Sequence, residues 1–164
     1  MTRGINLFYE RGIRMKTWTK TIEINAPIEH VWKFINGPIE NIQKIMPQYV
    51  ENTPIKITED IVGSVYRKKF EKGKWVQEYD VETLAYENTT ELKKLKIGFA
   101  LDQFFDVTAA YEVRKMNEWT TLFTYTITVN PLKWLVSVWL FFATEKRIVR
   151  FVEHMKHVAE AESA

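Results

Sequence analysis

Residues 21–38 read TIEINAPIEHVWKFINGP and place a strand, a turn and a helix in quick succession. Apolar and polar side chains alternate from Trp18 to Asn25, which is typical of a half-buried β-strand. Ala26-Pro27 ends that strand, and a proline suits the first turn of a helix. The next apolar residues recur at helical spacing and form one stripe, namely Ile28, Val31, Trp32 and Ile35.

The sequence around this segment predicts a second short helix and then a sheet. Gly37-Pro38 ends the first helix, and the apolar residues after it stop at Pro47. From there to Asn130 the pattern is that of strands joined by short turns, clearest in 105–113 and 122–129. Consecutive strands with short connections pair antiparallel, so we expect a meander.

The C-terminal segment is predicted to be one long helix. Asn130-Pro131 ends the sheet, and from Leu132 onward the chain contains neither Gly nor Pro. Residues 132–143 are apolar nearly all round, but they are fewer than the about 20 residues that span a bilayer. We therefore expect a buried helix, and an α+β domain in which about six to seven strands wrap it.

Composition excludes several classes of function. The 164 residues suit one domain, and the net charge of +2 is spread along the chain rather than gathered as in nucleic-acid binders. The basic stretch 67–74 is interleaved with aromatic residues, which favours a solvated hairpin over a basic binding patch. The absence of cysteine excludes disulfides, thiolate catalysis and cysteine-based zinc sites, and it fits a cytoplasmic location.

The first fourteen residues are expected to lie outside the domain. Residues 1–14 show no clear period and are followed at once by a second methionine, Met15. Codons for Glu10-Arg11-Gly12 can form a purine-rich stretch that resembles a ribosome-binding site. We therefore predict that 1–14 is a leader, disordered or non-native, and that 15–164 forms the single domain.

The segments Ile22–Pro27, Val31–Ile35, Met46-Pro47 and Val62–Ser64, with the turn residue Gly73, carry a resemblance to a known family. The chain resembles the START-like superfamily, also called SRPBCC, and within it the bacterial polyketide cyclase/dehydrase-like proteins. This resemblance implies a helix-grip fold that encloses a hydrophobic small molecule such as a lipid, a polyketide or a quinone-like compound. Some members catalyse cyclisation or dehydration, and others bind protein partners.

The interior predicted from strand alternation is rich in aromatic residues. The inward strand positions are Tyr79, Val81, Thr83, Phe105, Val107, Tyr111, Phe123, Tyr125 and Ile127. The facing positions of the long helix are Trp134, Leu135, Val138, Trp139 and Phe142. Mostly apolar surroundings with a few polar groups are typical of small-molecule pockets, so these residues are the predicted ligand-binding site. The alternative is a solid core without a ligand.

Strand orientation in the basic stretch stays open from the sequence. Either Arg67 and Lys69 or Tyr66, Lys68 and Phe70 face inward, and an inward Arg67 or Lys69 could anchor a carboxylate or an enolate. Arg67 and Lys69 are favoured to face outward.

We find no motif for a nucleophile elbow, a phosphate loop or a metal site, and expect no catalytic residue, cofactor or metal. His30 is expected to be exposed, and His154 and His157 to lie on a solvated helix end. The predicted function is binding of a small hydrophobic molecule, without nucleic acid and without stable membrane insertion. The alternatives are a cyclase or dehydrase acting on a polyketide-like substrate, and an interaction module whose segment 132–143 forms a homodimer or docks a partner.

Overall fold

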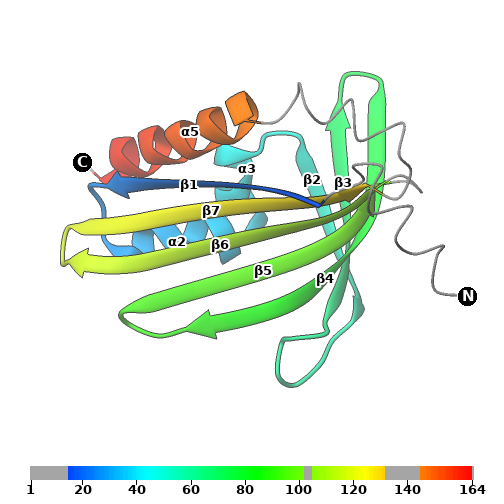
Figure 1. The fold of residues 1–164 in the computed structure, drawn as a ribbon, viewed down its shortest axis with the longest axis horizontal. Helices are drawn as coiled ribbons and strands as arrows, with labels where there is room; N and C mark the ends of the chain where they lie inside the picture. Colours follow the sequence, from blue (N-terminus) through cyan, green and yellow to red (C-terminus); the bar gives the residue numbers. More distant parts are fainter. Residues whose placement is uncertain (1–14, 102–104, 132–144, 164) are drawn as a thin grey trace, which may run out of the picture.

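The computed structural model describes residues 15–101, 105–131 and 145–163, arranged as a sheet with helices on one side (Figure 1). The helices are α2 (Ile28–Asn36), α3 (Ile39–Ile45) and α5 (Glu145–Ser163). The strands are β1 (Lys16–Ile24), β2 (Tyr49–Lys56), β3 (Val65–Lys72), β4 (Trp75–Asn88), β5 (Leu92–Leu101), β6 (Phe105–Asn117) and β7 (Thr120–Pro131). The predicted leader and the predicted helical residues 132–144 lie outside the described residues.

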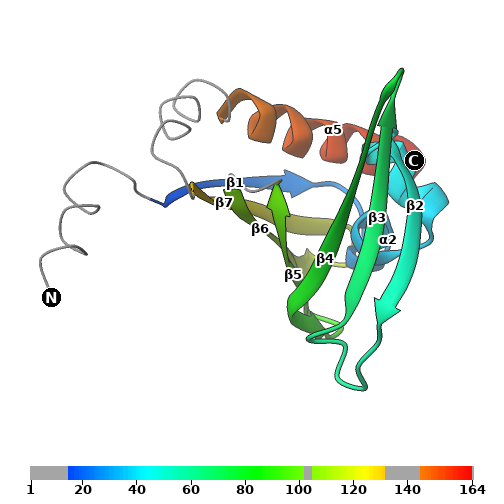
Figure 2. The same ribbon diagram turned by 90° about the vertical axis from the view of Figure 1, so that its right-hand side faces the viewer.

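The seven strands form one antiparallel sheet in the order β1-β7-β6-β5-β4-β3-β2. The two short helices carry the chain from β1 at one edge to β2 at the other, and the meander then returns to pair β7 with β1. Figure 2 shows that the sheet is strongly curved, with β2, β3 and β4 running across the direction of β1 and β7. The predicted α+β helix-grip fold is confirmed.

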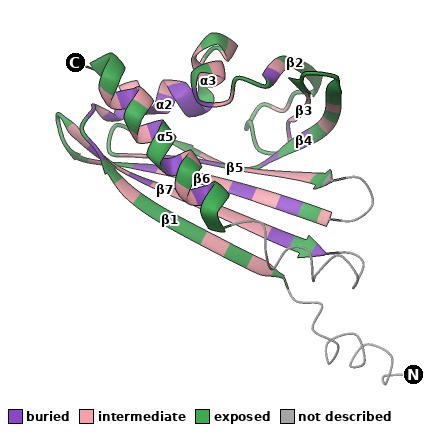
Figure 3. Cartoon of the chain, turned by 90° about the horizontal axis from the view of Figure 1, so that it is seen from above, coloured by how far each residue is buried: buried purple, intermediate pink, exposed green. Residues whose placement is uncertain are grey.

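Helix α5 covers the concave face beside β1, and its apolar stripe fits the sheet. Ile148, Val152 and Met155 are buried at helical spacing, while Phe123 of β7 is fully buried beneath them. Figure 3 shows the buried positions concentrated on α2, α5 and the strands that they cover, whereas the β2–β3 edge is largely exposed. Pro54 lies in β2, where a missing backbone N–H is tolerated because β2 is an edge strand.

The outer face of the sheet is polar. Threonines of β1 and β7 lie opposite one another, and their hydroxyls hydrogen-bond in pairs at 3.1 Å (Thr17 with Thr128), 3.1 Å (Thr19 with Thr126) and 2.9 Å (Thr21 with Thr124). Such cross-strand pairs stabilise the register of neighbouring strands. No helix within the described ranges combines the length and the hydropathy needed to cross a bilayer.

Candidate ligand-binding cavity

A described space lined by both apolar and polar side chains lies between the helix pair α2–α3 and strands β2–β5. Its volume is about 270 Å³. The apolar side chains that line it are Ile35, Ile42, Ile61, Val81, Leu95 and Ile97. The polar side chains are those of Asn36, Asn52, Tyr66, Lys68, Thr83 and Tyr86, with Tyr49 beside them. An apolar wall that carries a few polar groups is the usual composition of a small-molecule pocket.

A smaller cavity of about 40 Å³ continues this space toward the core. Both cavities are lined by Ile35, Ile42, Tyr49, Lys68, Leu95 and Ile97. The inner one adds the apolar residues Phe34, Ile45 and Met46 and the ring of Tyr111. The two spaces are therefore neighbours, and Lys68 is the one charged side chain that lines both.

The orientation of β3 is set by its pairing with β4. Arg67 lies opposite Asp80, and its guanidinium donates two hydrogen bonds of 2.8 and 3.0 Å to that carboxylate on the outer face. These bonds lower the pKa of Asp80 and raise that of Arg67. Lys69 also points outward and pairs with Glu71 at 2.8 Å. Tyr66 and Lys68 therefore face the cavity, which settles the alternative that the sequence left open.

Lys68 occupies an unusual environment for a lysine. Its side chain is only partly exposed, and its Nζ lies 5.3 Å from the centre of the Tyr49 ring. Burial lowers the pKa of Lys68 to about 8, because the charged form loses hydration there. Burial also raises the pKa of Tyr49, so that the tyrosine is a neutral phenol at physiological pH. Among the described residues, no carboxylate or hydrogen-bond acceptor pairs with the Lys68 ammonium.

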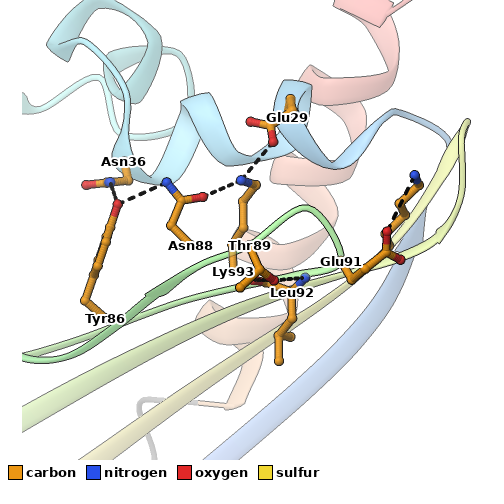
Figure 4. Close-up of polar contacts among 9 residues, drawn as sticks. Glu29, Asn36, Tyr86, Asn88, Thr89, Glu91, Leu92 and Lys93 are labelled. Atoms are coloured by element: carbon orange, nitrogen blue, oxygen red, sulfur yellow. Dashed lines mark hydrogen bonds and ion pairs between the residues drawn. The ribbon is translucent and has the colours of Figure 1, made fainter.

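A polar network fixes the wall between α2 and the β4–β5 turn (Figure 4). The amides of Asn36 and Asn88 both donate to the Tyr86 hydroxyl, at 3.4 and 3.3 Å. The Lys93 ammonium donates to the side-chain oxygen Oδ1 of Asn88 and forms an ion pair of 2.8 Å with Glu29. The network joins helix to sheet beside the pocket, so it holds Asn36 and Tyr86 in place on the cavity wall.

The predicted site residues are distributed over several places. Val81 and Thr83 line the larger cavity and Tyr111 lines the smaller one. Tyr79 lies in ring contact with Phe70 and Phe99, at 6.1 and 5.6 Å between ring centres. Val107 is buried, while Phe105 and Ile127 are partly buried, and none of the three lines either cavity. The predicted helix residues Trp134, Leu135, Val138, Trp139 and Phe142 lie outside the described residues.

Aromatic rings pack against one another under the described part of α5. Tyr125 packs against Tyr111 and Phe151, with ring centres 5.1 and 4.7 Å apart, and Phe123 is fully buried beside them. The hydroxyls of Tyr111 and Tyr125 hydrogen-bond to each other, and burial raises the pKa of Tyr111 to about 12. These tyrosines therefore have partners in the core, and a ligand contact for Phe123 and Tyr125 stays a prediction.

The contribution of the two short helices and of β2 to the pocket was not predicted from the sequence, whereas that of β3 was left open. Ile35 and Ile42 read as ordinary helix packing, and Tyr49 follows a proline with no periodic signal. A signal for Lys68 was present, however. Pairing across the two-residue turn Gly73-Lys74 puts Arg67 and Lys69 opposite Asp80 and Glu78, and an outward charged face on both strands turns Lys68 inward.

The histidines have structural roles. Contrary to the prediction, His30 is only partly exposed, because its Nε2 lies 2.9 Å from the Ala159 carbonyl oxygen at the end of α5. His154 is exposed, and its Nε2 lies 3.2 Å from the Lys44 carbonyl oxygen. Within the described ranges, no three His, Cys, Asp or Glu side chains gather in a way that would hold a metal ion.

Comparison with known proteins finds no matching family model and no matching curated sequence. Solved structures do match. Norcoclaurine synthase from Thalictrum flavum, in complex with dopamine and hydroxybenzaldehyde, is 14% identical with a TM-score of 0.63, and the match covers 100% of this chain and 96% of that one. Major latex-like protein 151 from Panax ginseng is 14% identical with a TM-score of 0.66, covering 92% and 98%.

A third neighbour is bacterial. The Zhui aromatase/cyclase from Streptomyces sp. R1128 is 11% identical with a TM-score of 0.66, and the match covers 90% of this chain and 94% of that one. Identities this low establish the fold and leave the activity to be argued from the site. The chain therefore shares the helix-grip fold of these structures, as its sequence predicted.

Proposed function

We propose that this protein binds a small, largely apolar molecule in the cavity between α2–α3 and β2–β5. The observation that carries the proposal is the pocket itself, about 270 Å³ with apolar and polar side chains in nearly equal number on its wall. This volume lies just below the about 300 Å³ at which pockets for drug-sized molecules begin, so a compact ligand of one or two rings fits best. A lipid, a polyketide fragment or a quinone-like molecule of that size belongs to this class.

Native mass spectrometry of the purified protein, followed by organic extraction, tests the proposal. Wild type is expected to carry or take up a small apolar molecule in a 1:1 complex. Val81→Phe places a ring in the cavity and should abolish uptake, whereas Val76→Phe changes an exposed residue of the same strand and should not. Equal uptake by the two variants, both folded by circular dichroism, would contradict the proposal.

A second candidate function is a cyclase or dehydrase reaction in the same cavity. It is favoured by two observations: Lys68, Tyr49 and Tyr66 bring titratable groups together in one pocket, and the fold neighbours include an aromatase/cyclase. A short poly-β-ketone thioester analogue incubated with the protein would report this activity as a new aromatic absorbance. Absence of turnover together with 1:1 binding would leave the binding function alone.

We also propose a cytoplasmic location and a single domain spanning 15–164, both of which rest on the sequence. Self-association through segment 132–143 remains the alternative use of that apolar stretch. Sedimentation over a range of concentrations distinguishes a helix buried within the domain from a homodimer contact, because a strict monomer would argue against the homodimer.

A further inference from the structure

Lys68 is the one lysine among the described residues that line these two cavities, and it lines both. Its backbone belongs to the middle of β3, so the position of the side chain is set by the register with β4 rather than by a loop. The Nζ atom lies over the Tyr49 ring, which is itself 2% exposed. A cation is thus held at a fixed depth in the pocket.

None of the described residues supplies Lys68 with a counter-charge. No Asp or Glu is among the described residues that line either cavity. The neighbouring cations differ in this respect, because Arg67 pairs with Asp80 at 2.8 Å and Lys69 with Glu71 at 2.8 Å. Even Lys93, the most deeply buried lysine of the described chain, has Glu29 at 2.8 Å. Buried charges are ordinarily paired, so a cavity cation without a carboxylate points to a partner that comes with the ligand.

We propose that Lys68 anchors the acidic group of the ligand, and that the cavity takes a compact apolar molecule carrying a carboxylate. This inference rests on the proposed function and specifies its ligand class. The hydroxyls of Tyr66 and Thr83 line the same space and offer neutral donors to the second carboxylate oxygen. The apolar body of the ligand then lies against Val81, Leu95 and Ile97.

The ionisation of Lys68 agrees with this arrangement. Its pKa of about 8 keeps most of the ammonium protonated at pH 7, although burial has made that charge costly. A bound carboxylate favours the charged form, so the pKa of Lys68 rises in the complex, and by linkage the acid binds more weakly as the pH is raised past 8.

Isothermal titration calorimetry with two probes of equal size tests the inference. The probes are 2-naphthoate and its neutral analogue 2-naphthamide, titrated at pH 7 into the full chain. Wild type is expected to bind the acid at least about ten-fold more tightly, since a hydrogen bond to a charged group contributes more than a neutral one. Lys68→Met should abolish the preference and keep the affinity for the amide, and Lys68→Arg should retain the preference.

Lys69→Met is the matched control, because that lysine is adjacent in sequence and points outward. It should bind both probes as wild type does. Equal affinities for acid and amide in wild type, or a preference that persists in Lys68→Met, would overturn the anchor while the binding function stands. If wild type bound neither probe, the proposed function would fail together with the inference.

Discussion

Replacement of Lys68 by methionine should make the free protein more stable at neutral pH. The pKa of Lys68 falls from 10.5 to about 8 on folding, and at about 1.4 kcal/mol per pKa unit this difference amounts to roughly 3 kcal/mol. Loss of the contact with the Tyr49 ring, 5.3 Å away, offsets about 1 kcal/mol of that gain. We therefore expect Lys68→Met to raise the free energy of unfolding by about 2 kcal/mol at pH 7.

The difference in stability between Lys68→Met and wild type is expected to depend on pH. Between pH 8 and 10.5 the unfolded state binds more protons at this site than the folded state, so the stability of wild type rises with pH there. The advantage of Lys68→Met is largest below pH 8, shrinks by about 1.4 kcal/mol per pH unit above it, and is therefore lost near about pH 9.5. Taking the difference between the two proteins cancels the titration of all other groups.

Urea denaturation at several pH values between 7 and 11 measures this difference. Lys69→Met is a control for which the opposite change in stability is expected. The hydrogen bond to Glu71 raises the pKa of Lys69, so loss of this bond should lower the free energy of unfolding at pH 7. A constant difference between wild type and Lys68→Met over the whole range would refute the account of a desolvated, unpaired ammonium.

Three further substitutions and one truncation test the fold around the pocket. Phe123→Ala removes a fully buried ring and should lower the free energy of unfolding by about 3–5 kcal/mol in urea; a loss below 1 kcal/mol would contradict its place in the core. Thr121→Val should cost about 1–2 kcal/mol, because the buried hydroxyl donates at 2.8 Å to the Ala26 carbonyl oxygen. Tyr86→Phe should lower the free energy of unfolding by about 1 kcal/mol and weaken binding of 2-naphthamide. Unchanged affinity would show that the hydrogen bonds from Asn36 and Asn88 to Tyr86 do not contribute to the binding site. A chain that begins at Met15 should melt at the same temperature as the full chain, and a marked loss would show that residues 1–14 belong to the domain.

Much of the fold could be predicted from the sequence because apolar and polar residues alternate over long stretches of the strands. In β7 apolar and polar residues alternate from Phe123 to Val129, and in β6 they do so from Phe105 to Val113 except at Ala110. One face of these strands is buried, so a shift of register would move their apolar side chains into water. The two short helices were predictable for a different reason, since Pro27 and Gly37-Pro38 mark where each begins or ends.

The position of the cavity could not be predicted in the same way. Strand alternation tells which side chains face inward, but whether they meet in a packed core or leave a space depends on the shapes that face them. Tyr111, Tyr125 and Phe151 fit together with ring centres 4.7 to 6.4 Å apart, whereas the pocket opens where α2 and α3 cover the β2–β5 half of the sheet. The sequence favoured an inward Lys68 and left it open, and the register of β3 with β4 decided it, since Arg67 lies opposite Asp80.

Chemical-shift mapping by NMR with 2-naphthoate tests most directly where a ligand binds. Saturable shifts that centre on Lys68, Val81 and Leu95, with a Lys68 Nζ pKa that rises on binding, are the predicted result. Shifts confined to Tyr125 and Phe151 beneath α5, or no saturable shift at any concentration, would contradict it.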